Sequence, residues 1–424
     1  MHLLLRKCIL LWQYALTLVQ SARIDKGREM AERHVVLGVS GSIAVYKAVD
    51  LASKFTQAGV SVHVVMTEAA TKLVGEASFR AITGLPVSTK MFELTNPHSI
   101  EHISLADIAD LFLLAPATAN VIAKMAAGIA DDLLTCTALA TRAPILIAPA
   151  MHTAMWSNAA TQTNIETLHA RGVRLIGPAV GRLASGGFGT GRFAPVSEIL
   201  GEVLKKLGKT GDLAGRKIVI TAGGTREPID PVRFLGNRST GKMGCALAEA
   251  ARDRGAIVTL ITGATSLPNP AGVETREVGT AADMLAAVEA AVTDVDVLIM
   301  AAAVADYAPS GSAEHKLKKG EAELLLRLSR TTDILDSVRD VPIRIGFAAE
   351  SENLIENAKG KLVAKDLDLI VANDISRSDS GIGADNNECT ILSPSEEPES
   401  LPLMPKREVA DHILNRVVKL LNAK

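Results

Sequence analysis

From residue 34 onward the chain alternates short apolar runs, rich in β-branched residues, with segments whose apolar residues recur at helical spacing. The run "HVVLGVS" (34–40) is followed by the turn "GS" and by the helical segment "AVYKAVDLASKFTQAG" (44–59). Such apolar runs are typical of strands that are buried on both faces of a parallel sheet. Strand, turn and helix in regular succession therefore predict a doubly wound α/β fold.

This succession occurs twice. The second series begins at "KIVITAGG" (217–224), after "EILGEVLKKLGKTGDLAGRK" (198–217) has turned from a helix into a stretch that carries Gly and Lys. A chain of 424 residues is also long for one core. We expect two Rossmann-like doubly wound domains with mainly parallel sheets, at residues 30–205 and 215–424, with a linker at 206–214.

Residues 1–29 do not fit either series, because they are apolar early and charged late. Their apolar run is too short and too interrupted for a helix that spans a membrane. We expect this stretch to be an upstream extension that is not part of the fold.

Charge and cysteine usage narrow the classes of partner. The net charge is -2, so no overall field attracts nucleic acid or an anionic membrane. The four cysteines lie far apart without CxxC spacing, which argues against a zinc site and a disulfide framework. These features predict a cytoplasmic protein that binds neither nucleic acid nor membranes.

Ligands of open parallel sheets bind at the carboxyl ends of the strands. In the first half, small and hydroxyl-bearing residues follow the strands, at 40–43, 66–70, 115–120 and 148–156. They allow close approach of the backbone and offer N–H and O–H donors to a phosphate. Any one of these segments alone is better explained as an ordinary turn. Together they favour a mononucleotide with a flat ring, such as FMN, because "GSI" departs from G-x-G-x-x-G.

The second half places cations in a long polar loop, "TAGGTREPIDPVRFLGNRSTGKMG" (221–244). Arg226, Arg233 and Arg238, with Lys242 before a helix N-terminus, could form an anion site. An ordered surface loop is the alternative, since the P-loop order of residues is absent.

Further along, Asp306 ends the apolar run "VLIMAAAVADY" (297–307), which we expect to be one strand. The segment "HKLKKG" (315–320) is either a solvated loop or a cover over a triphosphate. Lys361 and Lys365 are four residues apart, on one face of a predicted helix.

These motifs together resemble a bifunctional family of coenzyme A biosynthesis, in which phosphopantothenoylcysteine decarboxylase is fused to phosphopantothenate–cysteine ligase. The match covers about residues 33–420. The motifs of the first half are "GSIAVYK", "EHISLADIADLFLLAPATAN", "GIADDLL" and "PAMHTAMW". Those of the second half are the loop at 221–244, "AAAVADY", "HKLKK", "GFAAES", "KLVAKDLDLIVAND" and "DNN".

The resemblance implies two reactions. In the first, 4'-phosphopantothenate is ligated with L-cysteine at the expense of CTP, with Mg²⁺ and through an acyl-cytidylate. In the second, the product is decarboxylated with FMN to 4'-phosphopantetheine. It also implies a homo-oligomer with trimeric decarboxylase units and dimeric ligase units. A ligase with a non-catalytic flavin domain, and a regulatory flavoprotein subunit, are the alternatives.

The resemblance assigns roles to individual residues and none to a metal ligand. His102 would act in decarboxylation, and Asn237 would lie near the reacting acyl group. The residues implied for FMN are Gly41, Ser42, Ile43, Thr67, Ala117, Thr118, Ala119, Asn120 and Ala150. The residues implied for the substrates, CTP included, are His152, Met155, Ala301, Ala302, Asp306, Lys316, Thr332, Asp333, Ile334, Leu335, Phe347, Lys361 and Lys365.

The glycine-rich segment "RLASGGFGTGRFAP" (182–195) follows a polar stretch rather than a buried strand, which argues against a phosphate cradle. It is similar to the family's lid over the decarboxylase site. That lid carries a cysteine as proton donor, and Ser185 stands in its place here. A hydroxyl is a far poorer acid than a thiol, whose pKa is about 8.5, so another group or water is the alternative donor. His152 stands where the family has Asn and can likewise donate a hydrogen bond to the substrate carboxylate.

Overall fold

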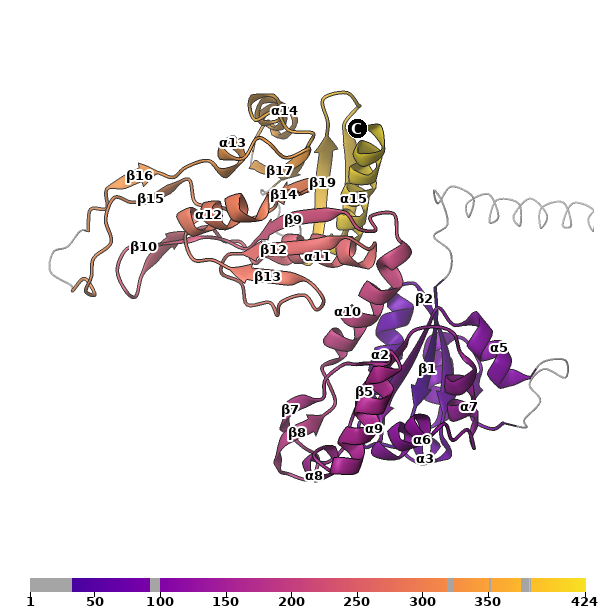
Figure 1. Ribbon diagram of the computed structural model, residues 1–424. Coiled ribbons are helices and arrows are strands. Elements are labelled where there is room, and N and C mark those ends of the chain that lie inside the picture. Colours follow the sequence, from indigo (N-terminus) through magenta and orange to yellow (C-terminus); the bar gives the residue numbers. More distant parts are fainter. Residues whose placement is uncertain (1–32, 92–99, 319–323, 351, 375–380, 382) are drawn as a thin grey trace, which may run out of the picture. The chain divides into compact units, whose positions relative to one another are not determined.

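The computed structural model describes residues 33–91, 100–318, 324–350, 352–374, 381 and 383–424. The expected extension at 1–29 lies outside these residues. The described chain forms two compact units (Figure 1). The first contains the residues up to Leu175 together with Val180–Arg192, and the second contains Ile176–Ala179 and Phe193–Lys424.

The first unit is built on a six-stranded parallel sheet. Its elements are β1 (Arg33–Val39), α2 (Val45–Gln57), β2 (Val60–Met66), α3 (Glu68–Thr71), α4 (Glu76–Thr83), β3 (Val87–Ser88), α5 (Glu101–Ile108), β4 (Leu111–Ala117), α6 (Ala119–Ala127), α7 (Leu133–Ala140), β5 (Ile145–Pro149), α8 (Thr153–Trp156), α9 (Ala159–Ala170), β6 (Arg174–Leu175), β7 (Ala179–Arg182) and β8 (Phe188–Arg192).

The strand order of this sheet is β3-β2-β1-β4-β5-β6, so the order reverses between β1 and β4. Apolar side chains of the strands, such as Phe112 and Ile147, form one cluster with α5, α6, α7 and α9. Helices α2 and α4 pack together on the other side, where Leu51 and Phe55 are fully buried. Burial on both faces is what the continuous apolar runs predicted.

The second unit has an eight-stranded sheet and the two-stranded sheets β10–β11 and β15–β16. Its elements are α10 (Val196–Leu207), the 3₁₀ helix η1 (Gly208–Thr210), β9 (Lys217–Ala222), β10 (Arg226–Pro228), β11 (Phe234–Gly236), α11 (Lys242–Asp253), β12 (Ile257–Thr262), β13 (Glu274–Glu277), α12 (Ala281–Ala291), β14 (Val297–Met300), β15 (Tyr307–Pro309), β16 (Leu328–Arg330), α13 (Ile334–Ser337), β17 (Ile343–Glu350), α14 (Leu354–Ala364), β18 (Leu369–Asp374), β19 (Asn386–Leu392), β20 (Glu399–Pro405) and α15 (Lys406–Ala423).

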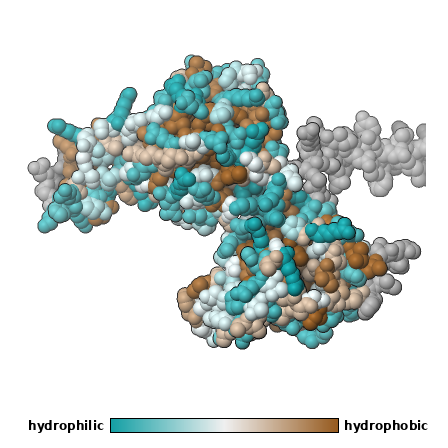
Figure 2. Space-filling model, in the orientation of Figure 1, coloured by the Kyte–Doolittle hydropathy of each residue, from teal (hydrophilic) through white to brown (hydrophobic). Residues whose placement is uncertain are grey.

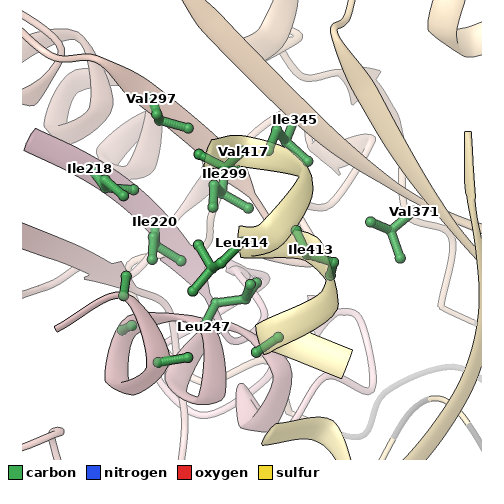
Figure 3. Packing of buried hydrophobic residues seen from close by; sticks show 14 of the residues in the cluster. Ile218, Ile220, Leu247, Val297, Ile299, Ile345, Val371, Ile413, Leu414 and Val417 are labelled. Atoms are coloured by element: carbon green, nitrogen blue, oxygen red, sulfur yellow. The ribbon is translucent and has the colours of Figure 1, made fainter. Parts of the chain in front are cut away.

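Strand alternation divides the core of this unit between two faces of the sheet, whose order is β13-β12-β9-β14-β17-β18-β19-β20. Ile218 and Ile220 of β9 pack with α11 and α15 on one face (Figure 3). Val219, between them, packs with α12 and α13 on the other face. The two last strands are antiparallel to their neighbours, so the sheet is mainly parallel.

The stretch expected to link the domains is packed on the second unit. Helix α10 ends at Leu207 and η1 follows directly. Beyond η1, Asp212 forms an ion pair at 2.6 Å with Arg254, the residue directly after α11. Residues 206–214 are therefore packed as part of the second unit.

One predicted strand is interrupted. The run 297–307 forms β14 only as far as Met300, and Tyr307 begins the separate strand β15. Between them the backbone N–H groups of Ala302 and Ala305 donate to the hydroxyls of Thr221 and Thr225, each at 3.0 Å. These bonds bend the chain away from the sheet, so the expectation of one continuous strand is wrong.

Candidate active sites

The reversal of strand order in the first unit lies between β1 and β4, where open α/β sheets bind their ligands. Ser40, directly after β1, is fully buried. Its hydroxyl donates to the carbonyl of Pro116 at 2.6 Å and accepts the N–H of Thr118 at 3.0 Å. Ser40 belongs to the segment 40–43 that the sequence singled out, but it was not among the residues predicted to bind FMN.

Further bonds join the ends of neighbouring strands at this edge. The Ser42 hydroxyl donates to the carbonyl of Ala150 at 3.2 Å, and the N–H of Ala150 donates to the carbonyl of Ala117 at 3.0 Å. The N–H of Thr67 donates to the carbonyl of Val39 at 3.0 Å. The structure thus places Ser42, Thr67, Ala117 and Ala150 along one edge. Because its hydroxyl is engaged, Ser42 acts here as part of the frame.

Two threonines at this edge can donate to an anion. Thr67 and Thr118 are the N-caps of α3 and α6, and their hydroxyl oxygens accept the N–H groups of Ala70 and Val121. A hydroxyl that accepts in this way keeps its own proton for another acceptor. Ala119 and Asn120 begin α6, where the backbone N–H groups have no partner inside the helix.

The same edge presents apolar side chains and allows close approach of the backbone. Ile43 and Met155 are 64% and 50% exposed, so both present apolar surface. A methyl group on Gly41 would lie 2.5 Å from Cβ of Ala69, so only glycine permits this approach of the backbone. Donors beside exposed apolar side chains fit a flavin mononucleotide.

The glycine-rich segment forms the hairpin β7–β8, and Ser185 lies exposed in its turn. The hairpin is fixed to the segment after β5, because the N–H of Met151 donates to the carbonyl of Gly191 at 2.9 Å. A methyl group on Gly189 would lie 2.5 Å from the hydroxyl of Thr153 in α8. The structure therefore agrees with the inference that this segment is no phosphate cradle.

His152 caps α8. Its Nδ1 accepts the N–H of Ala154 at 3.2 Å, so Nε2 carries the proton of the neutral ring. Asn158 caps the next helix in the same way, with its side-chain oxygen on Ala160. A histidine in this place therefore retains a free N–H donor, as an asparagine would.

His102 lies apart from these turns. It is half-buried in the first turn of α5, a helix that packs against α7 through its buried side. Within the described residues no hydrogen bond connects His102 with the ends of β1, β4 or β5. The structure does not bring it together with the other predicted residues of this chain.

In the second unit the strand order reverses between β9 and β14. Gly224, after β9, forms a bridge with Ala303, and the N–H of Ala303 donates to the carbonyl of Gly223 at 2.8 Å. The segment 301–305, which contains the predicted Ala301 and Ala302, is thus held over the reversal point. The threonines that hold it, Thr221 and Thr225, are fully buried and were not predicted.

The predicted Asn237 reaches this segment. Its side-chain amide donates to the carbonyls of Ala303 at 3.3 Å and Val304 at 3.0 Å. Asp306 follows the segment 301–305. Its carbonyl accepts the backbone N–H of Thr331 at 3.0 Å, which connects a further predicted part of the site. The predicted Thr332, Asp333, Ile334 and Leu335 follow directly.

The predicted lysines have partners. Lys361 of α14 forms an ion pair with Glu350 at 2.6 Å, and this hydrogen bond lowers the pKa of Glu350. Lys365 pairs with Asp333, so two predicted residues meet directly. Phe347, half-buried on β17, lies on the strand that ends at Glu350.

Lys316 is exposed on the segment that follows β15. The N–H of the next residue, Leu317, donates to the buried carboxylate of Asp230 at 3.1 Å. Arg233 donates to the same carboxylate at 2.9 Å and to the carbonyl of Leu317 at 2.9 Å. Asp230, which was not predicted, therefore anchors the predicted Lys316. Residues 319 and 320 of this segment lie outside the described residues.

The cations of the loop 221–244 do not converge on one anion site. Besides Arg233, the guanidinium of Arg226 lies 4.6 Å from the centre of the Phe234 ring, and Lys242 pairs with Asp385 at 2.7 Å. Because these three side chains each have a separate partner, the structure favours the alternative of an ordered surface loop for them.

Comparison with known proteins shows that each half of the chain matches a known family. The flavoprotein family matches residues 23–208, and the C-terminal domain family of the DNA/pantothenate metabolism flavoprotein matches residues 213–421. The coenzyme A biosynthesis bifunctional protein CoaBC of Bacillus subtilis is 47% identical over 394 residues, which cover 92% of this chain and 97% of that protein. The chain belongs to the CoaBC family.

Solved structures are similar to each half. The C-terminal domain of a CoaBC protein is 42% identical, and the match covers 51% of this chain and 100% of that one, with a TM-score of 0.44. The FMN binding protein AtHal3 is 33% identical, and the match covers 41% of this chain and 95% of that one, with a TM-score of 0.37.

Membership confirms the main prediction from the sequence. The chain is a bifunctional enzyme of coenzyme A biosynthesis, with a ligase and a decarboxylase activity, and its first part is a flavoprotein domain. In the part of the chain that the structure describes, no helix is long and apolar enough to cross a membrane.

Proposed function

We propose that the second unit uses CTP to activate 4'-phosphopantothenate. The observation that carries this proposal is the pair of hydrogen bonds from Asn237 to Ala303 and Val304, at the reversal of strand order. The substrate carboxylate attacks the α-phosphate of CTP, which gives an acyl-cytidylate and releases pyrophosphate. The amine of cysteine then attacks the acyl carbon, and CMP leaves.

A magnesium ion accompanies CTP in this proposal. Mg²⁺ at nucleotide sites is bound largely by phosphate oxygens and water, with few protein ligands. This fits the described residues, among which no group of three or more His, Cys, Asp or Glu side chains is placed to hold a metal ion. When bound with CTP, the cation would offset the charge that develops on the phosphates.

For the decarboxylase we propose that FMN is bound at the carboxyl ends of β1, β2, β4 and β5. Thr67 and Thr118 donate to its phosphate, Ile43 contacts its ring, and Met155 contacts the bound substrate. When bound there, the flavin would supply two-electron redox chemistry at the cysteinyl end of the substrate. The Nε2–H of His152 donates to the carboxylate of the substrate and orients it for departure. Ser185, exposed in the turn of the hairpin β7–β8, is the candidate proton donor.

A homo-oligomer and a cytoplasmic location complete the proposal, with trimeric decarboxylase units and dimeric ligase units. Figure 2 shows apolar side chains on the visible surface of both units. In the first unit, Ile100, Ile103 and Leu139 are 64%, 41% and 64% exposed. Exposed apolar surface of this kind supports contacts between copies. Such contacts would also let His102 of one copy reach the flavin edge of another.

The domain boundaries likewise remain part of the proposal: a decarboxylase domain at 30–205 and a ligase domain at 215–424. The gap between the two family matches, from residue 209 to 212, supports a division near the expected linker.

One incubation tests the two activities together. The purified protein is supplied with 4'-phosphopantothenate, cysteine, CTP and Mg²⁺, and the products are weighed by mass spectrometry. Phosphopantetheine supports both assignments. Phosphopantothenoylcysteine as the end product indicates a ligase with a non-catalytic flavin domain, a reading that Ser185 in place of the family's cysteine favours. A decarboxylated product that is two hydrogens short places the fault at the hairpin β7–β8.

The variant Lys316→Gln tests the nucleotide site separately. Ligation with CTP should be lost while bound flavin, measured by its absorbance, is retained. Undiminished ligation would show that the assigned CTP site is wrong.

A further inference from the structure

Two helices of the second unit begin with a lysine at the edge of the sheet where the nucleotide is proposed to bind. Lys242 is the first residue of α11, and Lys406 is the first residue of α15. A cation in the first turn opposes the helix dipole. Lys406 is also only 8% exposed, and burial lowers the pKa of its ammonium group to about 8. Both placements are unfavourable within the helix itself. We therefore expect each ammonium group to make compensating contacts outside its own helix.

Lys406 holds a loop between β18 and β19. Its ammonium group donates to the carbonyls of Gly381 at 2.9 Å and Ala384 at 2.6 Å. Its backbone N–H donates to the carbonyl of Asp385 at 3.1 Å. We call Gly381 together with Gly383–Asp385 the lysine-held loop. Three bonds from one residue fix the curvature of this loop and offset the cost of burying the charge.

Lys242 holds the same loop from the other helix. Its ammonium group donates to the carbonyl of Gly383 at 2.9 Å and to the carboxylate of Asp385 at 2.7 Å. The ion pair lowers the pKa of Asp385. Helices α11 and α15 pack against each other, so the two lysines bind the lysine-held loop from neighbouring helices.

The lysine-held loop lies at the ligand edge of the sheet. Strand β18 is parallel to β17, and its last residue, Asp374, is in register with Glu350 at the end of β17. The loop must therefore emerge where the nucleotide is proposed to bind. Asn387, just after the loop, donates to the side-chain oxygen of Asn373 at 2.9 Å, and Asn373 is in register with Ala349. The loop is thus connected to the strand that carries Phe347.

We propose that Lys406 and Lys242 are positioning residues of the ligase reaction, whose ammonium groups shape the lysine-held loop so that it completes the edge at which the nucleotide binds. Neither residue is among those that the resemblance assigned to the substrates. The inference rests on the proposed binding of CTP at this edge.

The test compares Lys406→Met and Lys242→Met with the control Lys419→Met, which alters an exposed lysine near the other end of α15. We expect the KM for CTP in the formation of phosphopantothenoylcysteine to rise about tenfold in both variants, equivalent to about 1.4 kcal/mol. The kcat should change less than about twofold, and flavin content should stay unchanged. The control and Lys242→Arg, which keeps the charge and the donors, should behave as the wild type.

Two outcomes would overturn the proposal. One is a folded Lys242→Met variant with the KM and kcat of the wild type, and this variant decides alone if Lys406→Met does not fold. The other is a loss of kcat that follows the loss of folded protein at unchanged KM, which is the mark of a purely structural role. If the wild type itself does not use CTP, the proposed function fails instead, a result that is separate from both.

Discussion

The hydroxyl of Ser40 accepts the backbone N–H of Thr118 at 3.0 Å and so connects the end of β1 with the start of α6. The same hydroxyl donates to the carbonyl of Pro116 in β4 at 2.6 Å. One buried side chain thus sets the spacing of the two strands between which the flavin is proposed to bind.

The variant Ser40→Ala should lose flavin. It leaves two polar groups without their partner, which costs about 1–3 kcal/mol, and it frees the cap of α6. We expect a lower flavin-to-protein absorbance ratio and a lower Tm of the first unit. Ser53→Ala is the control, because its hydroxyl accepts a hydrogen bond from the exposed Gln57 and lies away from the strand ends. Full flavin content in Ser40→Ala would contradict the framing role.

The variant Asn237→Asp should damage ligation alone. A carboxylate cannot donate to the carbonyls of Ala303 and Val304 and is repelled by them. We expect kcat/KM for ligation to fall about tenfold to a hundredfold, as for two lost hydrogen bonds. Decarboxylation of added phosphopantothenoylcysteine should be unchanged in the same preparation. A parallel loss of both activities would point to misfolding instead.

The variant Asp230→Asn should loosen the segment that carries Lys316 and raise the KM for CTP. The hydrogen bond from Arg233 holds the pKa of Asp230 well below its usual range. Its contribution to stability is therefore complete above the unfolded value of about 3.9 and is lost as the pH falls toward the folded value.

The Tm of Asp230→Asn should accordingly lie below that of the wild type at pH 7, and the difference should narrow below about pH 4. Asp294→Asn is the control, because its exposed pair with Lys217 should contribute little. A Tm difference that persists unchanged in acid would argue against the ionised carboxylate as the cause.

The sequence predicted the sheet edges well, because they follow from local pattern. The expected strand at 217–224 appears as β9 over Lys217–Ala222, and the expected helix at 44–59 appears as α2 over Val45–Gln57. Both reversal points of strand order then lie beside residues that the motifs had singled out, such as Ser42 and Ala302.

What the sequence did not predict depends on side chains that capture distant backbone. Thr221 bends the segment at Ala302 from 81 positions away, and this converts part of an expected strand into a loop. Asp230 accepts hydrogen bonds from Arg233 and Leu317. Arg233, which was a candidate for binding an anion, therefore helps to hold the segment beside Leu317 in place. Apolar periodicity carries no information on such pairings, since it reports only which face of an element is buried.

The hairpin turn offers a direct test of proton donation. If Ser185 limits the reductive step, Ser185→Cys should raise the rate of decarboxylation near pH 8, because a thiol with a pKa of about 8.5 is the better acid. Ser185→Ala should lower the rate, and ligation should be unchanged in both variants. Equal rates in wild type, Ser185→Ala and Ser185→Cys would show that another group or water supplies the proton.

The variant Glu249→Gln should stabilise the second unit at high pH. Burial raises the pKa of Glu249, and the nearby Arg252 opposes this only in part. The folded protein therefore binds the proton more tightly than the unfolded chain, whose value is about 4.3. Stability is lost as the pH rises from that value through the folded pKa, and the loss persists above it.

The variant cannot ionise, so its Tm should exceed that of the wild type at pH 8 and match it near pH 4. Glu356→Gln, at an exposed position of α14, should change neither value. A lower Tm of Glu249→Gln at pH 8 would show that attraction to Arg252 outweighs the cost of burial.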